Sequence, residues 1–557
     1  MTPATTLDFD PLHSSAAAAT PRSMGSARTL LPGALLLGVA SDALLRYPWG
    51  GVAIPIWFAL ASLALVAAAR RAGRSMPAET GGWLGVAVLL ACAIAWREAG
   101  LLQFLDFVAA GAALLMAAIS LCDPQGGVRA ARLRDTIWAT VSALLRTILG
   151  AAPTIAPMLR ELFAPSAARA GGVKALVRVT GIVAVLLIVF GSLLRGADPI
   201  FASLVTLPDL DAGEAVAHLL MVGIFTWLGT GWALAALGST QSAHRPPDVL
   251  PFGLGLLDLT AALGTLNLLF ATFLLAQLGW LFGGERFLHD RTGLTAAEYA
   301  RSGFFQMVWV VALVVPLLLV SRAALQPGRA LARRHTMLAL PLVALLGAMI
   351  VSAMLRMRLY VGYYGLTVDR FYPLAFMAWL SVLLLLLATT VLRDRGRRFV
   401  AGAMVSGLAT LALLNLVSPD RAIARVNLAR VSHSPRGSPR TLDLEHLATL
   451  SADAVELTVA ATLGEGPSTT STVAGADARV SRCRAARLLL YRWGPGSSAV
   501  ARTGMGGAWR YLNAGSWRAT ALVGREARAL RRLTRGPCDP PDAPRPPRDP
   551  VTRTSPE

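Results

Sequence analysis

The sequence predicts an all-α fold: a polytopic bundle of about eleven transmembrane helices, followed by a helical extramembrane region at the carboxyl terminus. Of its 557 residues, 55% are hydrophobic and only 15% are charged, whereas about 25% of the residues of an average soluble protein are charged. The apolar residues form long runs, and roughly 20 apolar residues are needed to cross about 30 Å of hydrocarbon. Because a single soluble core does not grow to this size, the composition excludes a soluble globular protein and indicates a lipid bilayer as the partner.

Eleven apolar runs are the predicted spans. The first four fall within residues 29–121, at 29–45, 51–69, 82–96 and 102–121. The other seven fall within residues 176–418, at 176–194, 215–237, 253–282, 304–321, 337–355, 371–392 and 399–417. The run at 82–96 is the weakest, because at about 1.5 Å per residue it covers only about 22 Å. Without it, the carboxyl terminus would lie on the other side of the membrane.

The basic side chains orient these spans. With the amino terminus inside, the inner segments carry 22 Lys and Arg residues, and the outer loops before residue 419 carry nine. Lysine and arginine accumulate in cytoplasmic loops. We therefore expect a multi-pass protein of the cell membrane with a disordered, cytoplasmic amino terminus (residues 1–28) and, after eleven spans, an extracytoplasmic carboxyl-terminal region.

Two segments outside the spans have a helical pattern. Residues 122–175 alternate apolar and basic positions, which predicts cytoplasmic amphipathic helices on the inner membrane surface or, alternatively, a short soluble helical hairpin. Residues 419–534 predict an extracytoplasmic helical region with amphipathic runs at 482–493 and 509–533. Within it, Ser451 is a predicted N-cap, because serine favours that position.

Two cysteines, Cys483 and Cys538, fall in the region expected outside the cytoplasm. A disulfide between them would persist there, because disulfides are stable in oxidising compartments, and it would close a loop of about 55 residues. The alternative is a free thiol at Cys538, which borders a Pro-rich tail (residues 535–557) expected to be disordered. The sequence slightly favours the free thiol.

Motifs of nucleotide and metal chemistry are absent from the sequence. It contains no P-loop, H-E-x-x-H, G-x-S-x-G or C-x-x-C motif, so we expect no metal, no cofactor and no classical catalytic site. The formal charge of +20 comes from arginines dispersed between apolar runs. A nucleic-acid-binding module would instead cluster them on one soluble face, so we expect no nucleic-acid partner.

Polar side chains at membrane depth are costly and therefore candidate functional groups; they are Asp106, His218, Asp258, Asn267 and Gln277. Asn267 lies near the middle of its span and most simply makes an interhelical hydrogen bond, worth about 1 kcal/mol. His218 is expected at the membrane interface, and the two aspartates at solvated helix ends. A continuous polar path through Asp258, Asn267 and Gln277 would instead indicate transport.

A second set of polar residues gathers at the predicted outer ends of the spans. The loop expected between the ninth and tenth spans combines arginines with tyrosines, and neighbouring loops add acids. The candidate ligand-binding residues are Arg356, Arg358, Tyr360, Tyr364, Arg370, Glu298, Arg301, Asp198, Asp420 and Asn427. Such groups form charge-assisted hydrogen bonds, so they either fasten helix ends together or bind an anionic lipid or phosphorylated small molecule. Because their loops share one side, we expect them at one depth.

Several strings in this part of the chain occur in the order of a known family. They are A-D-P-x-F at 197–201, A-x-Y-A-R-x-G-F-F at 297–305, R-M-x-L-Y-x-x-x-Y-G-L-T-x-x-R at 356–370 and P-D-x-x-I-A-R-x-N at 419–427. The chain resembles the bacterial multi-pass membrane proteins grouped as domain of unknown function 4173, with the related group 4153. One departure is Ser418, where the family pattern has asparagine. The resemblance implies a bacterial membrane protein and carries no activity, substrate or catalytic residue.

Two functions from different classes are compatible with these features. The first is an integral cell-envelope protein that acts as a transporter, scaffold or sensor and has an outward-facing Arg/Tyr/acid cluster. The alternative is a membrane enzyme that acts at the outer face on a lipid-linked or phosphorylated substrate, with Glu298 or Asp369 as the base. A cluster that converges around a cavity would favour the enzyme, and a filled, fully paired cluster would favour the first function.

Overall fold

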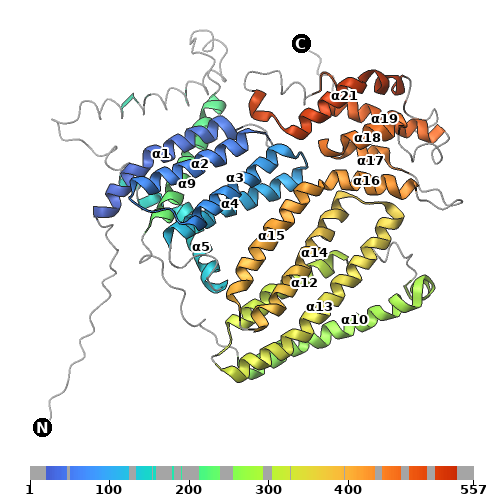
Figure 1. Ribbon diagram of the computed structural model, residues 1–557, viewed down its shortest axis with the longest axis horizontal. Helices are drawn as coiled ribbons and strands as arrows, with labels where there is room; N and C mark the ends of the chain where they lie inside the picture. Colours follow the sequence, from blue (N-terminus) through green and yellow to red (C-terminus); the bar gives the residue numbers. More distant parts are fainter. Residues whose placement is uncertain are drawn as a thin grey trace. The chain divides into compact units, whose positions relative to one another are not determined.

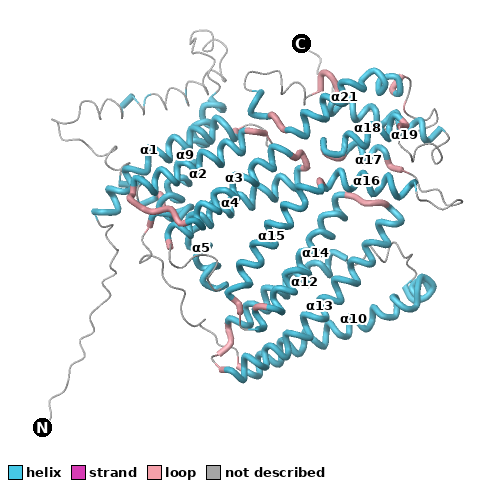
Figure 2. Tube along the Cα trace, viewed as in Figure 1, coloured by secondary structure: helices cyan, strands magenta, loops and turns pink. Residues whose placement is uncertain are grey.

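The computed structural model describes most of the chain between residues 21 and 538. The described ranges are 21–46, 51–123, 133–153, 155–157, 212–238, 255–292, 304–326, 328–393, 395–432, 442–465, 476–497 and 508–535, with a few single residues. Within these ranges every regular element is a helix and no strand occurs (Figure 2). The predicted all-α class is therefore confirmed. The chain forms two compact units, each described by itself below.

Nine of the described helices are long and apolar enough to cross a membrane. They are Ala53–Arg71, Ala78–Trp96, Gly100–Cys122, Val216–Leu237, Leu256–Gln277, Gln306–Ala323, Arg329–Tyr364, Val368–Arg393 and Arg398–Val417. Each coincides with a predicted span. The first predicted span corresponds to a shorter apolar stretch, Leu30–Leu45, and the span predicted at 176–194 lies outside the described ranges. The chain is thus a multi-pass membrane protein.

The weakest predicted span is longer than its apolar run suggested. Helix α3 (Ala78–Trp96) begins directly after Pro77 and has 19 residues, which corresponds to about 28 Å. It pairs with α4 (Gly100–Cys122), and the Thr80 and Ser120 hydroxyls share a hydrogen bond of 2.8 Å between the two helices. The helix is therefore long enough to cross the membrane.

The first unit comprises residues 1–46, 60–76 and 142–238. Its principal contact joins α1 (Pro21–Leu45) to α9 (Ala212–Leu237). The helices approach so closely at Gly38 that a Cβ atom there would lie 2.6 Å from the carbonyl oxygen of Val222. Small residues allow membrane helices to pack in this way.

We expect Gly38→Ala to separate these two helices, because the added methyl group overlaps backbone that cannot move independently. The expected cost is about 1–3 kcal/mol, measured as a lower unfolding temperature of the full-length protein in detergent. Gly33→Ala on the same helix is the matched control: nothing lies within 4 Å of its Cβ position, and alanine favours helix over glycine by up to about 1 kcal/mol. Equal destabilisation by both variants would contradict the close contact.

The second unit comprises residues 47–59, 77–141 and 239–557. Its largest core lies among five helices, in which α10 and α14 both contact α13 (Figure 1). These are α10 (Leu256–Thr292), α12 (Phe304–Ala323), α13 (Arg329–Tyr364), α14 (Val368–Thr389) and α15 (Arg397–Val417). Asn267 of α10 donates to the carbonyl of Leu338 of α13 at 2.8 Å, which is the interhelical hydrogen bond expected of it.

Helix α13 extends nine residues beyond the predicted span, so the expected loop from Arg356 is wrong up to Tyr364. The basic and tyrosine residues lower the hydropathy, but they do not interrupt the backbone hydrogen bonds of a helix. The helix ends only at Gly365, whose φ of 81° suits a residue without Cβ. The connection to α14 is therefore a turn of three residues. Helix α10 likewise continues past the expected loop start at residue 283.

Ser418 has the positive φ of a helix-ending residue. Helix α15 ends there, with φ at 56°, and Pro419 begins α16 (Pro419–Ser432). Asparagine tolerates positive φ better than most residues, which gives a physical reason for the asparagine of the family pattern at this position.

The helices that follow gather around a second apolar core of this unit, to which Leu366 of the α13–α14 turn also contributes; residues 419–538 are called here the C-terminal domain. Its members are α16, α17 (Leu444–Thr449), α18 (Val455–Leu463), α19 (Ala476–Trp493) and α21 (Ala514–Leu533). Leu447, Val459, Leu489, Val523 and Leu530 belong to this core. The two amphipathic runs predicted from the sequence correspond to α19 and α21.

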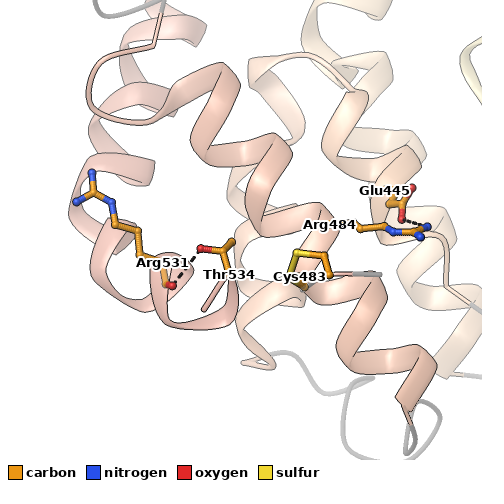
Figure 3. Close-up of a disulfide and its surroundings, with 6 residues drawn as sticks. Glu445, Cys483, Arg484, Arg531 and Thr534 are labelled. Carbon is orange, nitrogen blue, oxygen red and sulfur yellow. Dashed lines mark hydrogen bonds and ion pairs between the residues drawn. A yellow bond between two sulfur atoms is a disulfide. The ribbon is translucent and has the colours of Figure 1, made fainter. Parts of the chain in front are cut away.

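A disulfide joins Cys483 of α19 to Cys538 beyond the end of α21 (Figure 3). The Cα atoms are 5.5 Å apart, which is usual for a disulfide, and both cysteines are buried. The expectation that favoured a free thiol at Cys538 is therefore wrong. The sequence alone did not show that the residues after α21 return to α19.

Helix α5 (Leu133–Leu149) lies within the predicted amphipathic segment. Ile137, Val141, Leu144 and Ile148 are exposed along one side of it, which is the pattern of a helix with one apolar face. Most of the rest of that segment, from residue 158 onward, lies outside the described ranges. Its position on the membrane surface stays a prediction.

Candidate functional site

The Arg/Tyr cluster predicted at the end of the ninth span fastens the turn between α13 and α14. Arg370 donates through Nη1 to the carbonyl of Gly365, and its guanidinium stacks 4.2 Å from the ring centre of Tyr360. Asn427 of α16 binds both backbone polar groups of Leu366. Its Oδ1 accepts from the amide of Leu366, and its Nδ2 donates to the Leu366 carbonyl, each at 2.7 Å. These residues satisfy backbone groups at a helix end.

The other members of the predicted cluster have different surroundings, except Tyr364, which directly precedes the turn and whose ring centre lies 5.0 Å from that of Tyr360. Arg356 is buried within α13, eight residues or about 12 Å before the helix ends, so it belongs to the helix and not to the loop expected there. Arg358 and Tyr364 are exposed. Asp198, Glu298 and Arg301 lie outside the described ranges, and Asp420 is described below.

The polar residues predicted at membrane depth have separate surroundings. Asp106 is fully buried and accepts from Asn415 Nδ2 at 3.0 Å through both oxygens, so the expected solvation of its carboxylate is wrong. Asp258 is exposed and accepts from the Gly255 amide at the start of α10. In the first unit, His218 Nδ1 lies 2.5 Å from a carboxylate oxygen of Asp42.

A buried arginine that the sequence reasoning missed lies in the turn between α3 and α4. Arg97 Nε donates to the carbonyl of Asn415 at 2.8 Å, and Nη1 donates to Asp453 Oδ1 at 3.3 Å. Asn415 lies in the last turn of α15, where carbonyls lack intrahelical partners. A cation is favoured at a helix carboxyl terminus. Arg97 therefore joins three elements: the α3–α4 turn, the end of α15 and the C-terminal domain.

Glu98, the next residue, binds the same part of the C-terminal domain. Its Oε2 accepts from the amide of Ala452 at 2.7 Å, and its own amide donates to Asp453 Oδ2 at 3.4 Å. Desolvation raises the pKa of the Glu98 carboxyl above its ordinary value, although the Ala452 hydrogen bond opposes the rise. The glutamate thus caps the 3-10 turn Ala452–Ala454 from outside that segment.

Ser451 occupies the predicted N-cap position but does not cap with its side chain. Its backbone amide instead donates to Asp420 Oδ2 at 2.9 Å. Asp420, one of the predicted ligand-binding residues, is therefore buried as a structural acceptor.

Asn513 fixes the start of α21 against the same turn. Its Nδ2 donates to the carbonyls of Ile94 and Arg97, at 3.0 and 2.8 Å. Its Oδ1 accepts from the amides of Gly515 and Ser516 in the first turn of α21, as an N-cap asparagine does. One side chain therefore forms hydrogen bonds with backbone carbonyls at the end of α3 and with backbone amides at the beginning of α21.

An open pocket of about 610 Å³ adjoins the α3–α4 turn; we call it the arginine pocket. Its charged lining residues are Arg97, Arg421, Asp453, Glu456, Arg518 and Arg525. Trp517 and Leu522 of α21 supply apolar surface to the same lining. Four cations therefore face two acids, and such an excess of positive charge favours an anionic ligand.

The four arginines differ in their pairing. Arg97 is paired with Asp453, and Arg421 Nη2 lies 3.0 Å from Glu456 Oε2. Arg518 donates to the carbonyl of Ala514, and no described acid lies within ion-pairing distance of Arg518 or Arg525. Two guanidinium groups on α21 are thus available for an anion. The only sequence signal for them was their spacing of seven residues, which places them on one helix face.

A family model matches residues 84–461, which is more than half of the chain, and its description is "Domain of unknown function (DUF4153)". The chain belongs to the DUF4153 family. Of the two groups that the sequence strings resembled, this is the one supported. No curated protein and no solved structure matches the chain.

The matched region of this DUF4153 protein contains the buried part of the site and ends before part of the pocket wall. Arg97, Asn415 and Asp453 lie inside the match, whereas Arg518 and Arg525 follow it. The junction between the bundle and the C-terminal domain therefore belongs to the family domain, and the α21 side of the pocket lies outside it.

We expect Arg97→Ala to destabilise the protein strongly, because it leaves the Asp453 carboxylate, whose side chain is 2% exposed, without its cation. Removal of one partner of a buried pair costs about 3–5 kcal/mol. Arg421→Ala is the matched control, because its partner Glu456 is 68% exposed and such surface pairs contribute about 0–1 kcal/mol. Thermal unfolding in detergent measures both. Similar losses for the two variants would show that Arg97 does not hold the junction.

Proposed function

We propose that this DUF4153 protein resides in the bacterial cell envelope, binds an anionic ligand in the arginine pocket and acts as a sensor or scaffold. The supporting observation is the pair of arginines, Arg518 and Arg525, that line the pocket without a described acid partner. Guanidinium groups bind phosphate and carboxylate oxygens in a bidentate manner. The narrower assignment to group 4173 also belongs to this proposal and rests on the sequence strings.

The connection between the pocket and the membrane helices favours a sensor. Arg97 and Asp453 line the pocket, and Arg97 also donates to the end of α15. An anion that attracts Arg97 competes with these contacts, so binding and the position of α15 are coupled through one side chain. A ligand shifts a conformational equilibrium by its differential affinity for the two states.

Transport receives less support from the polar residues of α10. Asp258, Asn267 and Gln277 are spaced about 14 and 15 Å apart along the helix axis, with buried Leu263 and Phe270 between them. Gln277 is held by Ser352, whose hydroxyl donates to its Oε1 at 2.5 Å. The three side chains bind separate local partners and do not indicate a continuous polar path.

The alternative function is a membrane enzyme that acts on a phosphorylated or lipid-linked substrate in the same pocket. The observation in its favour is that Asp453 and Glu456 line the pocket beside the arginines, as a base and an anion clamp would. However, each acid already accepts a hydrogen bond from an arginine. This pairing favours binding over general-base chemistry, and turnover of a phosphorylated substrate would reverse that preference.

The C-terminal domain is proposed to lie outside the cytoplasm, with the amino terminus inside. Two independent observations support this orientation. The predicted inner segments carry most of the arginines that precede residue 419. The disulfide between Cys483 and Cys538 is of a kind that persists in oxidising compartments.

We expect the double variant Arg518→Gln/Arg525→Gln to bind pyrophosphate at least about tenfold more weakly than the wild type, because each lost charge-assisted hydrogen bond contributes about 1.5–3 kcal/mol. Isothermal titration calorimetry of the full-length protein at low salt measures the affinity. Arg528→Gln/Arg531→Gln is the matched control, since these exposed arginines of α21 do not line the pocket. Unchanged binding in the pocket variant, or no binding by the wild type, would refute the proposal.

We expect a membrane-impermeant maleimide to label Cys483 and Cys538 of intact cells only after reduction, in a variant that lacks the other two cysteines. The disulfide protects both thiols, and the proposed orientation places them on the side of the membrane that the reagent reaches once the bridge is reduced. Labelling only after lysis would place the C-terminal domain in the cytoplasm. Labelling without reduction would show that the bridge does not form in the cell.

A further inference from the structure

We infer that the anionic ligand of the arginine pocket is the phosphate-bearing headgroup of a membrane lipid, an inference that rests on the proposed function and names its ligand class. The first argument is depth. Arg97 directly follows Trp96, the last residue of the span Ala78–Trp96, and it donates to Asn415, in the last turn of the span Arg398–Val417. The ends of spans lie where the hydrocarbon core gives way to headgroups.

Exposed tryptophans mark the same level on the C-terminal domain. Trp509 and Trp517 are exposed, Trp517 by 63%. The segment between them is fixed to the bundle, because the amide of Val52, just before α2 (Ala53–Arg71), donates to the carbonyl of Leu512 at 3.1 Å. Tryptophan is enriched where a membrane protein meets the headgroups, since its ring is apolar with one polar atom. The start of α21 therefore lies at headgroup depth.

The pocket face of α21 suits an amphiphile. The helix buries Ala519, Val523 and Leu530 in the C-terminal domain. Another part of its surface places the exposed ring of Trp517 beside the two available arginines. Arg518 and Arg525 are separated by two turns, about 10 Å along the axis, a gap that two long, flexible side chains can close around one phosphate. The ring of Trp517 then contacts the glycerol and first acyl carbons.

A free phosphate would contact only the arginines of this lining. It would pair with the arginines and leave the exposed ring of Trp517 in contact with water, whereas a lipid contacts both the arginines and the tryptophan. Burial of apolar surface adds to the free energy of binding. A lipid phosphate and a soluble phosphate are therefore expected to bind with different affinities. The lipid should bind more tightly than the same headgroup without acyl chains.

The test compares dioctanoyl phosphatidic acid with glycerol 3-phosphate, its headgroup without chains, by native mass spectrometry of the delipidated full-length protein in detergent. We expect the lipid to bind at least about tenfold more tightly than glycerol 3-phosphate, since two short chains bury many methylene groups. Arg518→Gln/Arg525→Gln should weaken lipid binding at least about tenfold. Trp517→Ala should weaken binding of the lipid and leave that of glycerol 3-phosphate unchanged.

The outcomes separate this inference from the function on which it rests. Equal affinity for both probes, lost in the arginine double variant, would overturn the lipid assignment and leave a pocket for soluble anions. Lipid binding that persists in the double variant, or that falls equally in Arg528→Gln/Arg531→Gln, would overturn both, because adsorption to the basic surface of α21 would then explain it. Loss confined to the pocket variants supports both.

Discussion

The buried guanidinium of Arg97 is the constraint on which the rest of the second unit depends. A charge removed from water costs several kcal/mol unless it is paired and fully hydrogen-bonded. Arg97 meets this requirement with partners from two directions, the carbonyl of Asn415 and the carboxylate of Asp453. The α3–α4 turn, the end of α15 and the C-terminal domain must therefore come together for any of them to be stable, and Asn513 and Glu98 add hydrogen bonds at the same place.

The arginine pocket lies beside this junction, and its lining also contains guanidinium groups that differ from that of Arg97 in exposure and pairing. Arg97 is buried and satisfied by the protein, so it holds structure and is linked to the ligand only through competition for its contacts. Arg518 and Arg525 are exposed on α21, with no described acid in reach. Arginines without a described acid partner beside a tryptophan are suited to an anionic ligand, whereas a buried arginine paired with an acid mainly holds structure. Exposure and pairing distinguish an arginine that holds structure from one that binds a ligand, and neither property can be predicted from composition.

Three members of the cluster predicted from the sequence hold structure, as Arg97 does. Arg370, Tyr360 and Asn427 are directed at the backbone of residues 365 and 366, where the turn between two long helices leaves donors and acceptors without helical partners. Polar residues near a span end are needed for this purpose in any multi-pass protein. Their concentration in the sequence therefore identified a helix end correctly, and a ligand-binding role for them stays a prediction.

Hydropathy by itself determined the class of the protein and the position of nine described spans, because each span is a local property of about 20 consecutive residues. It placed the ends less well: α13 continues to Tyr364 because a helix depends on backbone hydrogen bonds, which charged side chains do not interrupt. Only the tertiary structure decided the junction, the disulfide and the pocket. Arg97 and Asp453 are 356 positions apart, and Cys483 and Cys538 are 55 apart, so no local pattern encodes their pairing. It follows from the burial of charge and apolar surface by the whole fold.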